Sequence, residues 1–149
     1  MAKEQTATAP VLQLRRIFQA PRERVFRAWT NAQELARWFA PTPDHTTAVP
    51  EFDFKVGGRY AIEMRHKNGN VHRVEGSYQQ IEPPAKLAFT WCWANDPTKH
   101  QSLVTVEFHD LGTSTEILLS HEQLPDGEQR GKHEEGWTGC FEQFAKYLA

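Results

Sequence analysis

Cysteine is scarce in this chain, which has only Cys92 and Cys140 among its 149 residues. The two lie far apart, and Cys92 stands between two tryptophans, so they lack the spacing of a disulfide framework. Because disulfides form and persist in oxidising compartments, two isolated thiols are typical of a reducing one. The cysteine content therefore predicts a cytoplasmic protein.

A long apolar run and an excess of positive charge are also missing. No stretch approaches the roughly 18–20 apolar residues of a membrane span, and residues 1–6 lack the apolar core of a signal peptide. The formal net charge is −2, with 17 lysines and arginines against 19 aspartates and glutamates. We therefore expect neither a membrane-spanning segment nor a basic surface for nucleic acid.

Common signatures of catalysis and metal binding are absent as well. The chain has no Gly-x-Ser-x-Gly pattern and no glycine loop for a phosphate, and Gly57–Gly58 is better interpreted as a turn. His133 and Glu134 begin a pattern that resembles a zinc-protease motif, but Trp137 occupies the place of the second histidine. We therefore expect no metal, no cofactor and no set of catalytic residues. Whether the chain is an enzyme stays open, and a binding protein is favoured.

Two short amphipathic helices are predicted between residues 21 and 40, directly after a strand over residues 11–19. Pro21 suits the first position of a helix, since its missing N–H would have no partner there. Thr30 and Gln33 have the spacing of a capping box and predict the start of the second helix. Each helix has an apolar stripe that must pack against a larger surface. The stripes consist of Val25, Phe26 and Trp29, and of Leu35, Trp38 and Phe39.

Alternating apolar residues predict about six further strands in the middle of the chain. The Asn68–Gly69 pair is a strong hairpin signal between two of them. Residues 42–50 are interpreted as a loop, and a long amphipathic helix begins near Gln129. The predicted strands cover residues 51–54, 59–67, 71–81, 87–93, 103–108 and 113–121.

Strands that are separated from helices along the chain predict an α+β fold. The last helix has an aromatic face, because Trp137, Phe141 and Phe144 recur at helical spacing. We expect a bent antiparallel sheet of about six to seven strands that wraps around this long C-terminal helix. The two short helices after the first strand would close its open end. Residues 11–149 would form one domain after a flexible tail of residues 1–10.

Four segments taken together resemble a known superfamily: residues 20–29, 38–41, 53–60 and 136–137. In this order and spacing they look like the SRPBCC or START-like (Bet v 1-like) superfamily. Within it they look like the AHSA-type branch, named after the C-terminal domain of the activator of the 90-kDa heat-shock-protein ATPase. The resemblance implies a helix-grip fold, in which a bent sheet holds the C-terminal helix with a cavity between them. It also implies apolar ligands, since superfamily members bind lipids, sterols and polyketides, and a few are cyclases or hydrolases.

The sheet and helix faces that would enclose this cavity carry the candidate ligand-binding residues. They are Trp38, Phe39, Tyr60, Met64, Phe89, Trp91, Trp93, His121, Trp137 and Phe141. His121 shares a strand face with Ile117 and Leu119, so we expect it to point inward, where it could orient a ligand or act as a general base. An interior helical glycine costs about 0.8–1.0 kcal/mol relative to alanine. Close approach of the sheet, space left for a ligand, or a looser helix start would explain Gly136 and Gly139.

Functions from three classes follow from these observations. The favoured one is binding of a small hydrophobic or amphipathic ligand in the cavity. The second is a cyclase-like or hydrolase-like enzyme that uses the same cavity, with His121 as the base. The third is a protein-interaction module such as a chaperone ATPase co-regulator, which would need a contiguous exposed apolar patch. A homodimer stays open under each of them.

Overall fold

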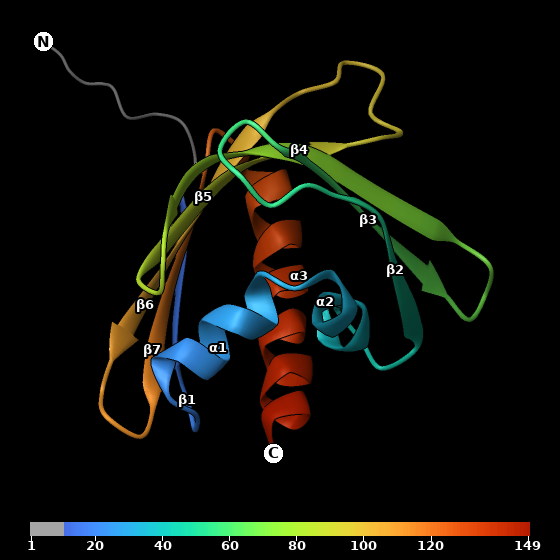
Figure 1. The fold of residues 1–149 in the computed structure, drawn as a ribbon. Coiled ribbons are helices and arrows are strands. Elements are labelled where there is room, and N and C mark those ends of the chain that lie inside the picture. The colour runs from blue at the N-terminus through green and yellow to red at the C-terminus, as the bar shows by residue number, and fades with distance from the viewer. Residues whose placement is uncertain (1–10) are drawn as a thin grey trace, which may run out of the picture.

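The computed structural model describes residues 11–149, and the tail predicted for residues 1–10 lies outside the described residues. Seven strands form one sheet that bends around a long helix, and two short helices lie across its open side (Figure 1). The elements in chain order are β1 (Leu12–Phe18), α1 (Arg22–Trp29), α2 (Ala32–Trp38), β2 (His45–Phe52), β3 (Arg59–His66), β4 (Val71–Glu82), β5 (Lys86–Trp93), β6 (Ser102–Asp110), β7 (Thr115–Glu122) and α3 (Gly127–Leu148).

The strand order is β1-β7-β6-β5-β4-β3-β2, which leaves β1 and β2 as the two edges of the sheet. All six neighbouring pairs are antiparallel. The hairpin predicted at Asn68–Gly69 joins β3 to β4, and Gly69 has the positive φ of +97° that such a turn requires. The predicted α+β class and the sheet wrapped around the C-terminal helix are confirmed. No helix among residues 11–149 is long and apolar enough to cross a membrane.

Strand β2 begins earlier than predicted, because part of the expected loop over residues 42–50 is extended and paired with β3. His45 lies opposite His66, and Phe52 lies opposite Tyr60. The register shifts between Ala48 and Glu51, so Pro50 lies in a bulge. Proline is tolerated there because β2 is an edge strand, where a missing N–H removes few ladder bonds.

Helix α2 begins one position later than the predicted capping box. Its N-cap is Asn31, whose Oδ1 accepts a hydrogen bond from the Glu34 backbone N–H at 3.0 Å. Thr30 instead closes α1, because its hydroxyl donates to the Phe26 carbonyl at 2.9 Å. The capping-box prediction was therefore wrong: asparagine caps a helix at least as well as threonine.

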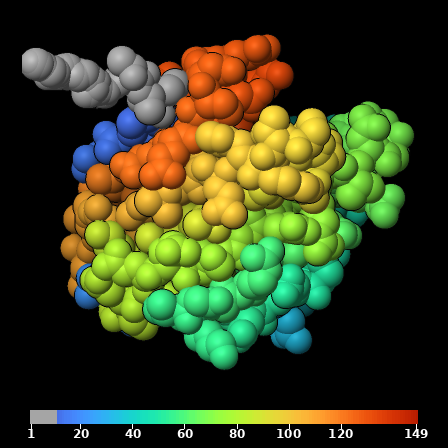
Figure 2. Space-filling view, turned by 90° about the horizontal axis from the view of Figure 1, so that it is seen from above, coloured from blue at the N-terminus to red at the C-terminus, as the bar shows by residue number. Residues whose placement is uncertain are grey.

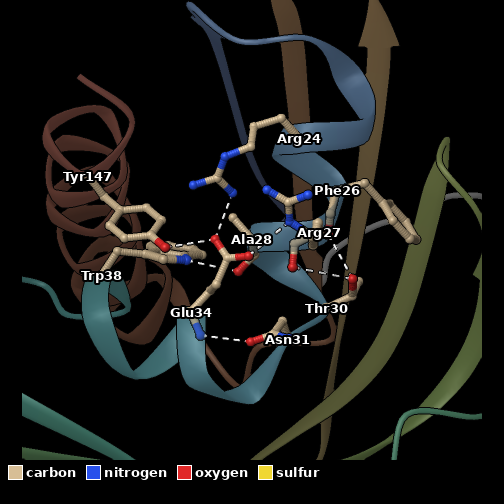
Figure 3. Close-up of polar contacts among 9 residues, drawn as sticks. All are labelled: Arg24, Phe26, Arg27, Ala28, Thr30, Asn31, Glu34, Trp38 and Tyr147. Carbon is tan, nitrogen blue, oxygen red and sulfur yellow. Dashed lines mark hydrogen bonds and ion pairs between the residues drawn. The ribbon is translucent and has the colours of Figure 1, made fainter.

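A carboxylate ties the three helices together where α1 and α2 meet the C-terminal end of α3 (Figure 3). Glu34 on α2 accepts hydrogen bonds from Arg24 on α1 at 2.6 Å and from the Tyr147 hydroxyl on α3 at 2.7 Å. Arg27 donates to its second oxygen at 3.1 Å. The Trp38 indole N–H donates to the Ala28 carbonyl at 3.0 Å, which joins α2 to α1 a second time.

The C-terminal half of α3 packs into an aromatic core. Phe144 has no exposed surface, and its ring centroid lies 4.4 Å from that of Trp38 and 5.0 Å from that of Phe18. Gly139 is required at the start of this half, because a Cβ there would lie 1.9 Å from the Pro41 carbonyl oxygen. The close approach expected of this glycine is therefore real, although the segment after α2 makes it rather than the sheet.

Candidate functional site

A cavity of about 410 Å³ lies between β3, β4 and β5 on one side and the N-terminal half of α3 on the other. The segment that follows α2 closes it with Phe39 and Pro41. The other residues that line it are Met64, His72, Trp91, Trp93, Asn95, Gln129, Lys132, His133, Gly136, Trp137 and Cys140. The first half of α3 thus faces open space, whereas its second half faces packed side chains.

Five of the predicted site residues line this cavity: Phe39, Met64, Trp91, Trp93 and Trp137. Their rings contact one another, with centroids 5.0 Å apart for Trp91 and Trp137 and 5.4 Å apart for Trp91 and Trp93. Phe39 meets the edge of Trp137 at 5.7 Å. These contacts hold an aromatic wall in place without filling the space beside it.

The other predicted residues lie outside the cavity lining. Tyr60 on β3 is deeply buried, its hydroxyl donates to the Thr90 carbonyl at 2.6 Å, and burial raises its pKa well above the usual value. Phe89 packs against Tyr60 with ring centroids 5.6 Å apart. Phe141 meets Phe18 at 5.5 Å, and Trp38 belongs to the helix contacts described above. All four contribute to the core that supports the cavity.

Gly136 marks the point where α3 borders the cavity. A Cβ built on this residue would meet no atom within 4 Å, in contrast to Gly139 one turn later. The space left beside Gly136 is the second explanation that the sequence offered for glycines in this helix. The two glycines therefore serve opposite local needs, close packing at one and open volume at the other.

His121 is fully buried behind the aromatic wall, and its hydrogen bonds fix its protonation. The Trp137 indole N–H donates to His121 Nδ1 at 3.1 Å, so Nδ1 carries the lone pair. The neutral ring therefore holds its proton on Nε2 and donates it to the Ser102 hydroxyl at 2.7 Å. Ser102 in turn donates to the Trp91 carbonyl at 3.3 Å. Burial, helped by nearby His133, lowers the pKa of His121 to about 3.

His133 makes a second indole–imidazole pair at the edge of the cavity, and sequence reasoning missed it. Its Nδ1–H donates to the Gln129 carbonyl one turn back at 2.7 Å, and its Nε2 accepts from the Trp93 indole N–H at 3.0 Å. Burial lowers its pKa below the usual value of 6.5. The Trp93–His133 bond joins β5 directly to α3.

Neither buried histidine offers a lone pair to a substrate, because an indole N–H occupies each one. A general base must accept a proton from the reacting molecule, so this arrangement disfavours the expected base role of His121. Burial also raises the pKa of the Cys140 thiol to about 12, which leaves it protonated and weakly nucleophilic. The cavity lining thus offers apolar surface and hydrogen-bonding groups.

The lining residues on α3 that were not predicted share a regular spacing. Gln129, Lys132, His133 and Cys140 lie at i, i+3, i+4 and i+11 of the helix, on the same face as Gly136 and Trp137. Helical periodicity could therefore have identified them, although their mixed polarity hid the stripe. Asn95 lies in a loop, where no periodic pattern operates.

A sheet wrapped around its C-terminal helix, with a cavity between them, defines a helix-grip protein of the START-like superfamily. Within that class, the chain belongs to the family described as Activator of Hsp90 ATPase homolog 1-like protein, whose model matches residues 19–149. This confirms the AHSA-type resemblance of the sequence. A search of the curated proteins finds no match to the chain.

Solved structures share the fold over most of the chain. Protein CV1439 from Chromobacterium violaceum is 26% identical, with a TM-score of 0.85 over 93% of this chain and 96% of that one. The AHSA1 protein SPO3351 from Silicibacter pomeroyi is 28% identical, with a TM-score of 0.80 over 93% of this chain and 97% of that one. A protein from Arthrobacter aurescens is 24% identical with a TM-score of 0.82, over 97% and 89% of the two chains, and this likeness shows the fold alone.

Proposed function

We propose that this protein binds a small hydrophobic or amphipathic molecule in the cavity between the sheet and the N-terminal half of α3. The observation that carries the proposal is a cavity of about 410 Å³ with aromatic walls, which lies within the usual size range of small-molecule sites. Phe39, Met64, Trp91, Trp93 and Trp137 are the proposed apolar contacts. Burial of the ligand's apolar surface would supply the binding free energy at about 25 cal/mol per Å².

The open space beside Gly136 also supports binding. An interior helical glycine costs about 0.8–1.0 kcal/mol relative to alanine, and nothing in the described fold prevents a larger residue at this position. This cost in helix stability is offset only if the volume beside the helix is used. A bound molecule in that volume is the simplest use.

The two alternatives have weaker support. Catalysis with His121 as base lacks a free lone pair, as shown above. An interaction surface would need a contiguous apolar patch, but the large exposed apolar residues of the described chain are spread over β1 and three separate turns or hairpin ends. They are Val11, Ile17, Val56, Val71 and Leu111. A chaperone partner is suggested by the family's name alone, and a cytoplasmic location by the two unpaired cysteines.

The proposal is tested by calorimetric titration with naphthalene, an apolar probe that the cavity can hold. Wild-type protein is expected to bind it, and Gly136→Leu to weaken the binding at least tenfold, because the leucine side chain would project into the cavity beside the aromatic wall. Gly131→Leu is the matched control, since it lies on the same helix in open space but outside the cavity lining. Absence of binding to wild type, or equal binding to both leucine variants, would contradict the proposal.

A further inference from the structure

A second hollow of about 350 Å³ adjoins the first at the N-terminal end of α3. It lies under the β5–β6 loop and the segment that leads into α3, which are neighbours on the surface in Figure 2 (yellow and orange). The two hollows share Trp91, Trp93, Asn95, Gln129 and His133. The hydrogen-bonded pair Trp93–His133 therefore stands between them, with one hollow on each side.

The second hollow has a different chemistry from the first. Besides the shared Trp91 and Trp93, it is lined by the polar residues Asp96, Thr98, His100, Ser102 and Asp126. Most of these groups already have partners. Asp96 accepts from the Thr98 backbone N–H and hydroxyl at 2.9 and 2.8 Å, Asp126 caps α3 at the Gln129 N–H at 2.8 Å, and Ser102 is bonded to His121. These hydrogen bonds hold the polar side chains of the second hollow in fixed positions.

Two carboxamides remain free at the junction of the hollows. The side chains of Asn95 and Gln129 make no hydrogen bond within residues 11–149, and both residues line both hollows. Asn95 comes from the loop after β5, and Gln129 from the first turn of α3. An amide both donates and accepts hydrogen bonds, so this pair matches a ligand hydroxyl or carbonyl.

The indole of Trp91 adds a third unsatisfied group at the same junction. The other two tryptophans of the wall, Trp93 and Trp137, donate to histidines, whereas the buried Trp91 N–H has no partner within the described residues. Trp91 lines both hollows. A ligand oxygen near the junction could accept a hydrogen bond from this N–H.

The charges around the junction do not favour a charged ligand. The one lysine of the lining, Lys132, has the Glu128 carboxylate 3.7 Å away, and the aspartates of the second hollow are bonded to backbone N–H groups. Both ring nitrogens of His133 already have hydrogen-bond partners. The lining therefore offers no unpaired cation to an anionic head group, and the N–H groups already bound to Asp96 and Asp126 compete with a cationic one.

We propose that the ligand is a neutral amphipathic molecule that spans the junction. Its apolar body lies against the indoles of the first hollow, and its hydroxyl or carbonyl group lies between Asn95 and Gln129. This inference rests on the proposed function, because it specifies the chemistry of the molecule that the same cavity takes.

Matched naphthalene derivatives test the inference in the wild-type protein. We expect 2-naphthol to bind about five- to tenfold more tightly than naphthalene, as one or two additional hydrogen bonds would give. The anion 2-naphthoate and the cation 2-naphthylmethylammonium should bind no better than naphthalene. The paired variant Asn95→Leu/Gln129→Leu should lose the preference for 2-naphthol over naphthalene, measured as the ratio of the two affinities in that variant. Gln143→Leu, on the same helix but outside both hollows, is the control and should keep it.

The outcomes separate this inference from the proposed function. If naphthalene itself does not bind, the proposed function fails. If naphthalene binds but 2-naphthol has no advantage, or keeps its advantage in the paired variant, the neutral polar subsite is overturned. A preference for the anion would assign the head group to Lys132 instead. The wild-type comparison is decisive even if the paired variant does not fold.

Discussion

The two halves of α3 lie in opposite environments. The half around Phe141 and Phe144 packs its inner face against aromatic rings, whereas the half around Gln129 to Gly136 borders open volume and is attached to the sheet by indole–imidazole hydrogen bonds. The C-terminal half stabilises the fold through its packing, whereas the N-terminal half is packed less closely and leaves space beside it. The difference shows how one helix can both anchor a fold and form the wall of a cavity.

The largest effect should come from creating a void in the packed half. Phe144→Ala is expected to lower the free energy of unfolding by about 3–5 kcal/mol, because a fully buried ring is lost among neighbours that cannot collapse. Met64→Ala should cost only about 2 kcal/mol, since Met64 already borders a cavity and loses fewer contacts. Urea denaturation measures both. Equal losses of unfolding free energy in Phe144→Ala and Met64→Ala would contradict the distinction between the packed half of α3 and the half that borders the cavity.

The half beside the cavity should carry the pH dependence. The pKa of His121 is lowered to about 3 by burial and by His133, so its ring takes up a proton more readily in the unfolded chain. Stability is therefore intact above the ordinary pKa of 6.5 and falls as the pH drops below it. The expected loss from His121 alone is about 2 kcal/mol between pH 7 and pH 5.

Denaturation of wild type and His121→Gln at several pH values isolates this contribution. The variant should start from a lower stability, because Trp137 and Ser102 lose an ideal partner, but its curve should be flatter between pH 7 and pH 5. Parallel curves for the two proteins would show that the histidine is not held neutral by its surroundings.

The smallest of these effects should come from Glu34, which holds the helix pair to the packed end of α3 (Figure 3). Burial opposes ionisation of this carboxyl, but the hydrogen bonds from Tyr147 and Arg24 outweigh it, and the pKa is lowered overall. Glu34→Gln should cost about 1–2 kcal/mol at pH 7, as expected for charge-assisted bonds that are partly exposed. The difference from wild type should shrink as the pH falls below 4.5, because Glu34 takes up a proton in the unfolded chain before it does in the folded protein, and it should vanish once the folded carboxylate is protonated at lower pH.

The same variant separates the two halves in function. Naphthalene affinity should stay within twofold of wild type in Glu34→Gln, because Glu34 contacts neither hollow. A larger change in affinity would mean that the helix pair and the cavity are coupled through α3.

The fold was largely predictable, because alternation and helical spacing are local properties of the chain. Tyr60, Ile62 and Met64 could be assigned to the inner face of one strand, and the structure confirms that all three are buried. Their separate roles could not be assigned. The Tyr60 hydroxyl bonds to the Thr90 carbonyl within the core, whereas Met64 borders the cavity, and only the three-dimensional path of α3 distinguishes the two positions.

The polar half of the site escaped prediction for a related reason. Asn95 is an exposed loop residue with no pattern around it, and Gln129 looks like a solvated position in the first turn of a helix. They meet because the β5–β6 loop lies over the start of α3, a contact between segments that are far apart in sequence. Such residues can be assigned to a site only from the folded structure, in which both segments border the same hollow.

Pro50 has a consequence for how this protein can assemble. An exposed edge strand is a template on which another chain can extend the sheet, and β2 is one of the two edges here. Pro50 has no N–H to offer, and the bulge around it breaks the regular row of donors and acceptors along the strand. A partner strand therefore finds no continuous ladder along β2, and the sheet is protected at this edge against growth into larger aggregates.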